Sequence, residues 1–201
     1  MLPKLLLATN NKGKVREYRH LLHDLPYELV TLAEQNITTV VAETGQSLED
    51  NARLKATALA KESRLITLAD DSGLEVDALG GEPGPLSARY AGEDASDKER
   101  VRYLLARLEG VPWEKRKARF RCVIALAKPD GQVELCQGER RGYITFAPKG
   151  EQGFGYDPVF YLPELDKTMA ELSLEIKNQV SHRGQAARQV YQKLERLTGI
   201  K

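Results

Sequence analysis

Short apolar runs and amphipathic segments alternate along the chain. Three runs predict strands: 4–8, 28–32 and 65–69. Between them, Val15, Tyr18, Leu21 and Leu22 recur at helical spacing, and a second helical pattern extends from Ser47, a good N-cap, to about residue 63. This order of strand, loop and helix predicts an α/β fold.

The second half of the chain adds antiparallel signals. Ser96 and Glu99 have the spacing of a capping box at the start of an amphipathic helix, and Thr168 with Glu171 repeats that spacing. Two strand patterns, 119–128 and 132–145, are joined by a Pro-Asp-Gly turn, and a last helix follows with an apolar face from Ala187 to Leu194. The sequence therefore predicts a mixed α/β fold with at least one hairpin.

Size and charge limit the possible functions. The chain has 201 residues, of which 41% are hydrophobic and 29% charged, which suits one folded domain over 1–201. Repeats and low-complexity tracts are absent from the sequence. The net charge of +1 provides no overall field that attracts nucleic acid or membranes, so an anion site must be a local arrangement.

Two further features concern the cellular compartment. The sequence lacks a run near the roughly 20 apolar residues of a membrane span and lacks a signal-peptide layout, so we expect a cytoplasmic protein. Cys122 and Cys136 lie in predicted strands and have no metal-ligand spacing. They are expected as buried free thiols, although across a hairpin they could face each other.

Four polar segments contain residues typical of a site. Asp70, Asp71 and Ser72 follow the apolar run 65–69, and carboxylates at the C-terminal end of a buried strand suit metal or phosphate chemistry. An ordinary turn is the alternative. In the same way, the polar segment 9–14 lies between a strand and a helix, where backbone N–H groups favour an anion. A capped polar connection is the alternative.

The other two segments suit a planar ligand. Phe154 and Tyr156 stand among glycines, where a base could stack on a ring, or the two rings could anchor a tight turn in the core. Before the last helix, His182 and Arg183 could contact a base or a phosphate. Alternatively, Ser181 is an N-cap and the two basic residues lie on the surface of the first turn.

Glu43 is a further candidate for chemistry, whereas the basic run 115–121 and two histidines have structural interpretations. Glu43, in a loop before a helix, could supply a carboxylate to Mg²⁺, or be a solvated loop acid. The basic run 115–121 predicts an edge strand protected by charge rather than a nucleic-acid surface. His20 and His23 are expected on the surface of the first helix.

Taken together and in order, these segments resemble the inosine triphosphate pyrophosphatase family, the non-canonical purine nucleotide pyrophosphatases (dITP/XTP pyrophosphatases). The resemblance covers Leu5 to about Leu194 and rests on LLLATNNKGKVREY, AETGQSLEDNARLKA, ADDSGLEVDALGGEPGPLSARYAGEDA, GFGYDPVF, KTMAEL and KNQVSHRGQA. It implies an elongated α/β fold of two lobes around a central mixed sheet, with the site in the cleft between the lobes. It also implies a homodimer.

The resemblance further implies a Mg²⁺-dependent hydrolase that cuts ITP, dITP or XTP between the α and β phosphates. Asp71 matches the proton acceptor, and Glu43 and Asp71 match metal ligands. The residues that match substrate contacts are Thr9, Asn10, Asn11, Lys12, Gly13, Lys14, Lys55, Ser72, Phe154, Gly155, Tyr156, Asp157, Lys177, His182 and Arg183. The chain departs from the common pattern at Asn10, often a glycine, and at Asp50, often a glutamate.

Three other function classes compete with this one. The first is a purine nucleotide sensor without hydrolysis, which would be favoured by the loss of a metal-binding acid, although Glu43 and Asp71 are both present. The second is a related enzyme for modified pyrimidine triphosphates, against which the Phe154 loop and the Ser181–Arg183 segment argue. The third is a nucleic-acid binder, which salt-dependent DNA binding would test.

Overall fold

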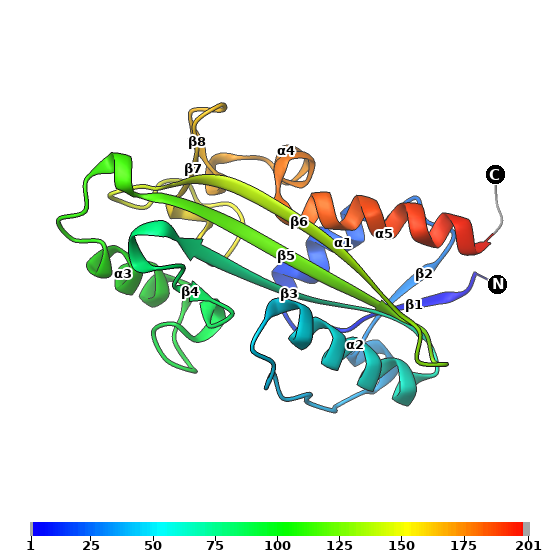
Figure 1. Ribbon diagram of the computed structural model, residues 1–201. Coiled ribbons are helices and arrows are strands. Elements are labelled where there is room, and N and C mark those ends of the chain that lie inside the picture. Colours follow the sequence, from blue (N-terminus) through cyan, green and yellow to red (C-terminus); the bar gives the residue numbers. More distant parts are fainter. Residues whose placement is uncertain (1, 199–201) are drawn as a thin grey trace. The chain divides into compact units, whose positions relative to one another are not determined.

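The computed structural model describes residues 2–198, and its central feature is one mixed β-sheet. The strand order is β2 (Glu28–Thr31), β1 (Lys4–Leu7), β3 (Ile66–Val76), β5 (Lys117–Ala127), β6 (Val133–Ile144), β7 (Phe160–Leu162) and β8 (Lys167–Thr168), and β4 (Pro83–Gly84) pairs with β3. Strand β1 is parallel to β2 and β3, whereas β4, β7 and β8 pair antiparallel (Figure 1). The predicted α/β class with a mixed sheet is confirmed.

The helices begin where their caps predict. The α-helices are α1 (Lys12–Leu21), α2 (Leu48–Ser63), α3 (Asp97–Arg107), α4 (Leu174–Val180) and α5 (His182–Thr198). Ser47 accepts a hydrogen bond from the Asp50 amide at 3.1 Å, and Ser96 forms the complete capping box with Glu99. The second capping box also forms, but it closes a single 3₁₀ turn, Met169–Glu171. Helix α4 was not predicted.

Within its described residues, the chain forms two compact units. The first unit contains residues 2–71, 122–138 and 183–198, and the second contains 72–121 and 139–182. Strands β3, β5 and β6 contribute residues to both. The prediction of a single domain over 1–201 and of a cleft between lobes stays a prediction.

The first unit is layered because β1 is buried on both faces. Successive side chains of a strand point to opposite faces. Leu5 and Leu7 therefore pack with Tyr18 of α1 and Val190 of α5, whereas Leu6 and Ala8 pack with the alanine-rich face of α2. In Figure 1, α1 and α5 accordingly lie on one side of these strands and α2 on the other. Because the side chains on both faces of β1 are apolar, helices must cover the sheet on both sides.

The second unit has a separate core. Leu74 of β3, Phe120 of β5 and Phe160 of β7 pack with the apolar face of α3, which includes Val101 and Leu104. The rings of Phe120 and Phe160 lie 4.4 Å apart between centroids. The loop around residue 154 packs against this core through Tyr156, which is part of the same cluster.

Two strand predictions were wrong. Strand β3 continues to Val76 instead of ending at Ala69, so the two aspartates lie in the middle of a strand rather than at its end. The basic run enters β5, which lies inside the sheet between β3 and β6 and is not an edge. Its charge is tolerated there because Arg119 pairs with Glu75 at 2.6 Å and with Glu139 at 3.0 Å.

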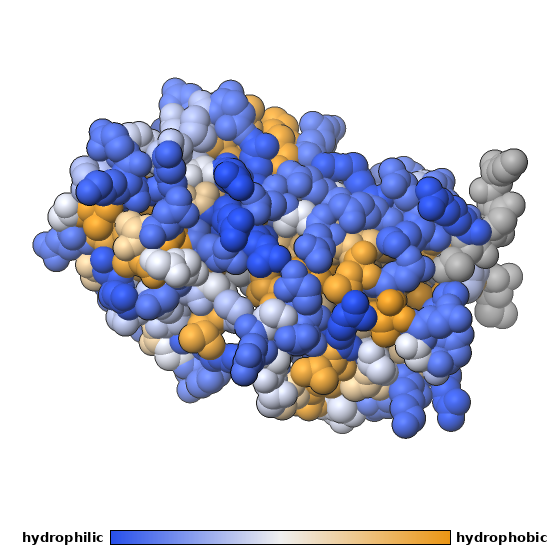
Figure 2. Space-filling view, in the orientation of Figure 1, coloured by the Kyte–Doolittle hydropathy of each residue, from blue (hydrophilic) through white to orange (hydrophobic). Residues whose placement is uncertain are grey.

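The predictions for the cysteines and the first two histidines are confirmed. Cys122 and Cys136 are buried and are not joined in a disulfide, and His20 and His23 are exposed, although His23 lies just beyond the end of α1 at Leu21. Figure 2 shows a face covered mainly by hydrophilic side chains, with separate hydrophobic patches. Among the described residues, none of the helices is both long enough and apolar enough to cross a membrane.

Candidate active site

The centre of the site is the pair of aspartates in β3. Because neighbours in a strand point to opposite faces, Asp70 and Asp71 meet different partners. The Asp70 carboxylate lies 2.9 Å from the Lys14 ammonium, on the side of α1 and α5. The Asp71 carboxylate accepts a hydrogen bond from the Asn51 side chain at 3.1 Å, on the side of α2.

Asp70 is an ionised carboxylate in the interior. Burial by itself would raise its pKa, but the positive charges of Lys14, Arg183 and Lys55 outweigh burial and hold the pKa well below its ordinary value. The Arg183 guanidinium lies 3.6 Å from the same carboxylate oxygen as Lys14. Asp70 therefore contacts charged side chains from the first turns of both α1 and α5.

Glu17 extends this buried charge network. Its carboxylate accepts a hydrogen bond from Arg183 at 2.6 Å, and both side chains are only 3% exposed. Burial alone would lower the pKa of Arg183, but Glu17 and Asp70 raise it well above its ordinary value. Sequence reasoning missed Glu17, although an acid beside Tyr18 on the apolar face of α1 is an available signal.

Arg183 lies in the first turn of α5, but it is not a surface residue there. The alternative that placed His182 and Arg183 on the surface was therefore wrong: their exposed fractions are 3% and 2%. Paired carboxylates make burial of the guanidinium possible, since an unpaired buried charge is strongly unfavourable.

Oxygen atoms converge on the ammonium of Lys55. It donates to the Glu43 carboxylate at 2.7 Å and to the backbone carbonyl of Asp70 at 2.8 Å, and it lies 3.9 Å from the Asp71 carboxylate. Burial raises the pKa of Asp71 and Glu43 adds to the rise, against the opposing charges of Lys55 and Lys14. More positive charge at this point would favour the ionised form of Asp71.

These donors fit a small hard cation. Glu43 and Asp71 offer carboxylate oxygens, and Mg²⁺ is commonly held by one or two carboxylates together with substrate phosphates. Among residues 2–198, clusters of three or more His, Cys, Asp or Glu side chains suited to a metal are absent. Two carboxylates without a complete protein cage are the donor set expected for a cation that shares its ligands with a phosphate.

The polar segment 9–14 is partly helical. Helix α1 begins at Lys12, so Lys12, Gly13 and Lys14 lie in its first turn and not in a loop. The Asn11 side chain caps the helix by accepting from the Lys14 amide at 3.0 Å, and Thr9 accepts from the Asn11 amide at 3.2 Å. The first turn holds no acid, which leaves the positive end of the helix suited to an anion.

In the second unit, Asp157 organises the loop at 153–157. Its carboxylate accepts from the Phe154 amide at 2.8 Å and pairs with the buried ammonium of Lys177. The Lys177 ammonium lies 4.8 Å from the centre of the Phe154 ring. Gly153 and Gly155 have φ values of 75° and 62°, which favour glycine.

The two aromatic residues of this loop differ in role. Tyr156 is buried and donates a hydrogen bond from its hydroxyl to the Ser87 carbonyl at 2.9 Å, so it anchors the loop in the core. Phe154 is half-buried. His182, at the start of α5, stacks on Phe120 at 4.7 Å with an interplanar angle of 12°.

The predicted site residues are divided between the two units. The first unit contains residues 9–14, Glu43, Lys55, Asp71 and Arg183, and its charged side chains are in mutual contact through Asp70, Lys55 and Glu17. The second unit contains the half-buried Ser72, residues 154–157, Lys177 and His182.

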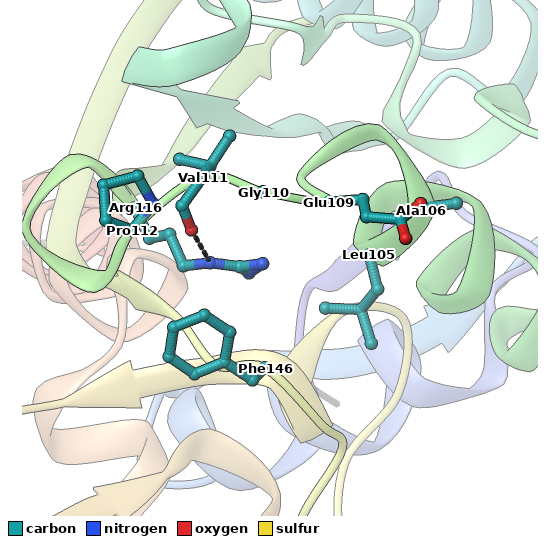
Figure 3. A pocket seen from close by; sticks show the side chains of 8 residues that line it. All are labelled: Leu105, Ala106, Glu109, Gly110, Val111, Pro112, Arg116 and Phe146. Atoms are coloured by element: carbon teal, nitrogen blue, oxygen red, sulfur yellow. Dashed lines mark hydrogen bonds between the residues drawn. The ribbon is translucent and has the colours of Figure 1, made fainter.

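A separate cavity of about 460 Å³ in the second unit contains none of the predicted site residues. Arg116 points into it beside Phe146 (Figure 3). The guanidinium donates to the carbonyl oxygens of Leu108 at 2.9 Å, Val111 at 3.1 Å and Thr145 at 3.1 Å. Arg116 thereby joins the C-terminal end of α3 to the strands, a structural role that explains its burial.

Comparisons with known proteins find similar sequences and similar folds. A dITP/XTP pyrophosphatase of Desulforamulus reducens is 52% identical over 194 residues, covering 96% of each chain. The structure of the Staphylococcus aureus Ham1 protein superposes with a TM-score of 0.85 at 44% identity, covering 96% of this chain and 98% of the other. A HAM1 protein from Coxiella burnetii gives a TM-score of 0.87 at 41% identity, covering 97% of this chain and 100% of the other.

The match to the family model also covers nearly the whole chain. The profile of the Ham1 family covers residues 5–193, which include every residue of the charge network around Asp70 and of the loop at 153–157. Sequence, fold and site thus point to one family over nearly the whole described chain. This protein belongs to the Ham1 family.

Proposed function

We propose that this protein hydrolyses non-canonical purine nucleoside triphosphates to the nucleoside monophosphate and pyrophosphate. ITP, dITP and XTP are its substrates, and its role is to remove deaminated purines before they enter DNA or RNA. The observation that carries the proposal is the convergence of Lys55, Glu43 and Asp71 beside the Lys14–Asp70 pair. The dITP/XTP pyrophosphatase at 52% identity supports the choice of substrate class.

The chemistry follows from the charges of these residues. A triphosphate carries several negative charges, and Lys14 at the start of α1 and Lys55 on α2 are placed to neutralise them. Glu43 and Asp71 would hold Mg²⁺, which when bound supplies charge neutralisation at the phosphates. Asp71 accepts the proton of the attacking water, and Asn51 orients its carboxylate through the 3.1 Å hydrogen bond.

Selection among purines belongs to the second unit. A 6-keto purine offers a hydrogen-bond acceptor where adenine has an amino donor. A fixed donor of the protein therefore pairs with the keto oxygen, but it has no acceptor to pair with when adenine is bound. We place this donor at His182, which is oriented by Phe120, and place the stacking surface at Phe154. An unpaired buried donor costs roughly 1–3 kcal/mol, which corresponds to about tenfold to hundredfold rejection of the wrong base.

Two further parts of the proposal concern assembly and location, of which the first comes from the family resemblance and the second from the sequence pattern. We propose a homodimer and a cytoplasmic location. Light scattering coupled to gel filtration would give the mass of the species in solution, which should be about twice the 22.5 kDa of one chain. A mass of one chain would remove the dimer from the proposal without affecting the reaction.

The function is tested by product analysis. The protein is incubated with Mg²⁺ and equal amounts of ITP, dITP, XTP, GTP and ATP, and pyrophosphate and free phosphate are measured separately. Monophosphate plus pyrophosphate from the first three, with little product from ATP, is the expected result. Free phosphate would show γ-phosphate hydrolysis, and binding without turnover would show a nucleotide sensor; both outcomes contradict the proposal.

A further inference from the structure

A carboxylate outside the predicted site holds the loop at 153–157. The Gly155 amide donates a hydrogen bond of 2.7 Å to the side chain of Asp97, the first residue of α3. Asp97 is 58 positions away in the sequence and belongs to the same compact unit. The sequence motifs give no indication of this contact, because Asp97 has an ordinary position for an acid in the first turn of a helix.

Asp97 is itself fixed in place. Its second carboxylate oxygen pairs with Arg100, one turn along α3. The Arg100 guanidinium also donates to the backbone carbonyl oxygens of Ala88, at 2.8 Å, and Ala95. The helix start is fixed independently by the Ser96–Glu99 capping box. The Asp97 carboxylate that accepts from the Gly155 amide is therefore held in a fixed position.

Hydrogen bonds, more than packing, determine the position of this part of the loop. A cavity of about 490 Å³ borders both Asp97 and Gly155, so little side-chain packing supports the loop on this side. Gly155 has a φ of 62°, and a Cβ added there would meet no atom within 4 Å. The peptide between Phe154 and Gly155 is held at its amide by Asp97, at 2.7 Å, and at its carbonyl by the Asp157 amide, at 3.3 Å, so loss of the Asp97 acceptor would remove the shorter of these two hydrogen bonds.

The two carboxylates around the loop act on successive amides. Asp157 accepts from Phe154 and Asp97 accepts from Gly155, so both peptide planes next to the Phe154 side chain are fixed. The direction of the Phe154 ring depends on these planes. A loop that presents a ring to a flat ligand needs this preorganisation, since ordering on binding would reduce affinity.

We infer that Asp97 is a positioning residue for base selection, which acts through Gly155 and the Phe154 ring. The inference rests on the proposed function, because it assumes that this loop contacts the base. Loss of the Asp97 acceptor should weaken binding of the correct purine more than binding of ATP. The chemical step, which involves Asp71, should change little once substrate is saturating.

The test compares Asp97→Ala, Asp97→Asn and a control, Glu99→Ala. Asparagine keeps an acceptor oxygen for the Gly155 amide, whereas alanine removes it. Glu99→Ala breaks the capping box and weakens the start of the same helix without removing a partner of the loop. Steady-state kinetics with ITP and ATP are measured for each variant, with thermal unfolding recorded in parallel.

Because one hydrogen bond is lost in Asp97→Ala, we expect KM for ITP to rise about fivefold. The ratio of kcat/KM for ITP to kcat/KM for ATP should fall by a similar factor. In this variant kcat for ITP stays within about twofold. Asp97→Asn should restore most of the ratio, and Glu99→Ala should lower the melting temperature while keeping the ratio. An unchanged ratio in Asp97→Ala, or an equal fall in Glu99→Ala, would overturn the inference.

A second measurement does not depend on turnover. With ¹⁵N-glycine labelling, the Gly155 amide should exchange with solvent faster in Asp97→Ala than in the wild type or Glu99→Ala, because its acceptor is gone. Equal exchange in all three would also overturn the inference. Failure of the proposed function is recognised separately, since it would appear in the wild type as an absence of pyrophosphate release.

Discussion

Asp70 and Asp71 are neighbours of the same residue type, and their carboxyl groups have pKa values shifted in opposite directions. Both are buried, and burial raises both pKa values. For Asp70, the charges of Lys14 and Arg183 outweigh burial; for Asp71, burial prevails and Glu43 adds to it. One residue is a fixed anion within a charge network, and the other is a carboxylate that can exchange a proton.

Replacement of Asp71 tests this division of roles. Asp71→Asn keeps the shape of the side chain and its proximity to Asn51 but removes both the charge and the proton acceptor. Turnover of ITP should fall at least about 100-fold, because general-base catalysis contributes on that order. The measurement is pyrophosphate release at saturating ITP, with circular dichroism to verify folding.

The matched control is Asp77→Asn, an exposed acid that directly follows β3. It should keep wild-type turnover. Near-normal activity in Asp71→Asn would contradict the assignment of the proton acceptor, whatever the control shows.

Helix α1 combines three tasks in one short element. Asn11 caps its start, Lys14 in its first turn reaches Asp70, and Glu17 one turn later reaches Arg183. Residues three or four apart lie on the same face of a helix, so Lys14, Glu17 and Tyr18 all point toward the sheet. Glu17 is therefore buried beside the aromatic ring and Lys14 is partly buried there, and both charges depend on pairing with opposite charges for their stability.

Glu17→Gln should destabilise the protein by about 3 kcal/mol, because it removes the negative charge that pairs with the buried Arg183 at 2.6 Å, although an acceptor oxygen remains. Urea unfolding measures the change in free energy. The control on the same helix is Arg19→Gln, which breaks a half-exposed pair with Glu34 and should change the free energy of unfolding much less, because water screens exposed charges. Similar losses in the two variants would argue against a buried network.

At the scale of the whole molecule, positive and negative charges are nearly equal in number, and charged side chains pair with opposite charges close to them. The net charge is +1, and the basic run that enters β5 is compensated within the second unit by Glu75 and Glu139. The described residues of the charge network around Asp70 likewise combine bases with acids: Lys14, Lys55 and Arg183 with Asp70, Asp71, Glu17 and Glu43. Stability should therefore depend on pH through paired carboxylates.

The stability of the whole protein should fall in acid partly through Asp70. Its folded-state pKa is lower than its unfolded value of 3.8, so its contribution is present above about pH 4 and is lost as pH falls through the folded pKa. The difference in unfolding free energy between wild type and Asp70→Asn should therefore shrink as the pH falls below about 4. Chemical denaturation at several pH values measures it, and a constant difference would contradict the depressed pKa.

Local interactions explain which features the sequence alone determined. The alternation of apolar runs and amphipathic segments predicts the α/β class, and the caps at Ser47 and Ser96 place two helix starts correctly, because each cap involves residues only three positions apart. The order of polar segments also indicated the family, since each motif is contiguous in the chain.

Only the tertiary structure decided how the site residues are paired. The chain continues β3 through Asp70 and Asp71, so strand alternation sends the two carboxylates to opposite faces, and no local pattern shows where that strand ends. The partners Glu17 for Arg183 and Asp97 for Gly155 lie 166 and 58 positions away in the sequence. Such contacts depend on burial and packing of distant segments, which local sequence patterns do not contain.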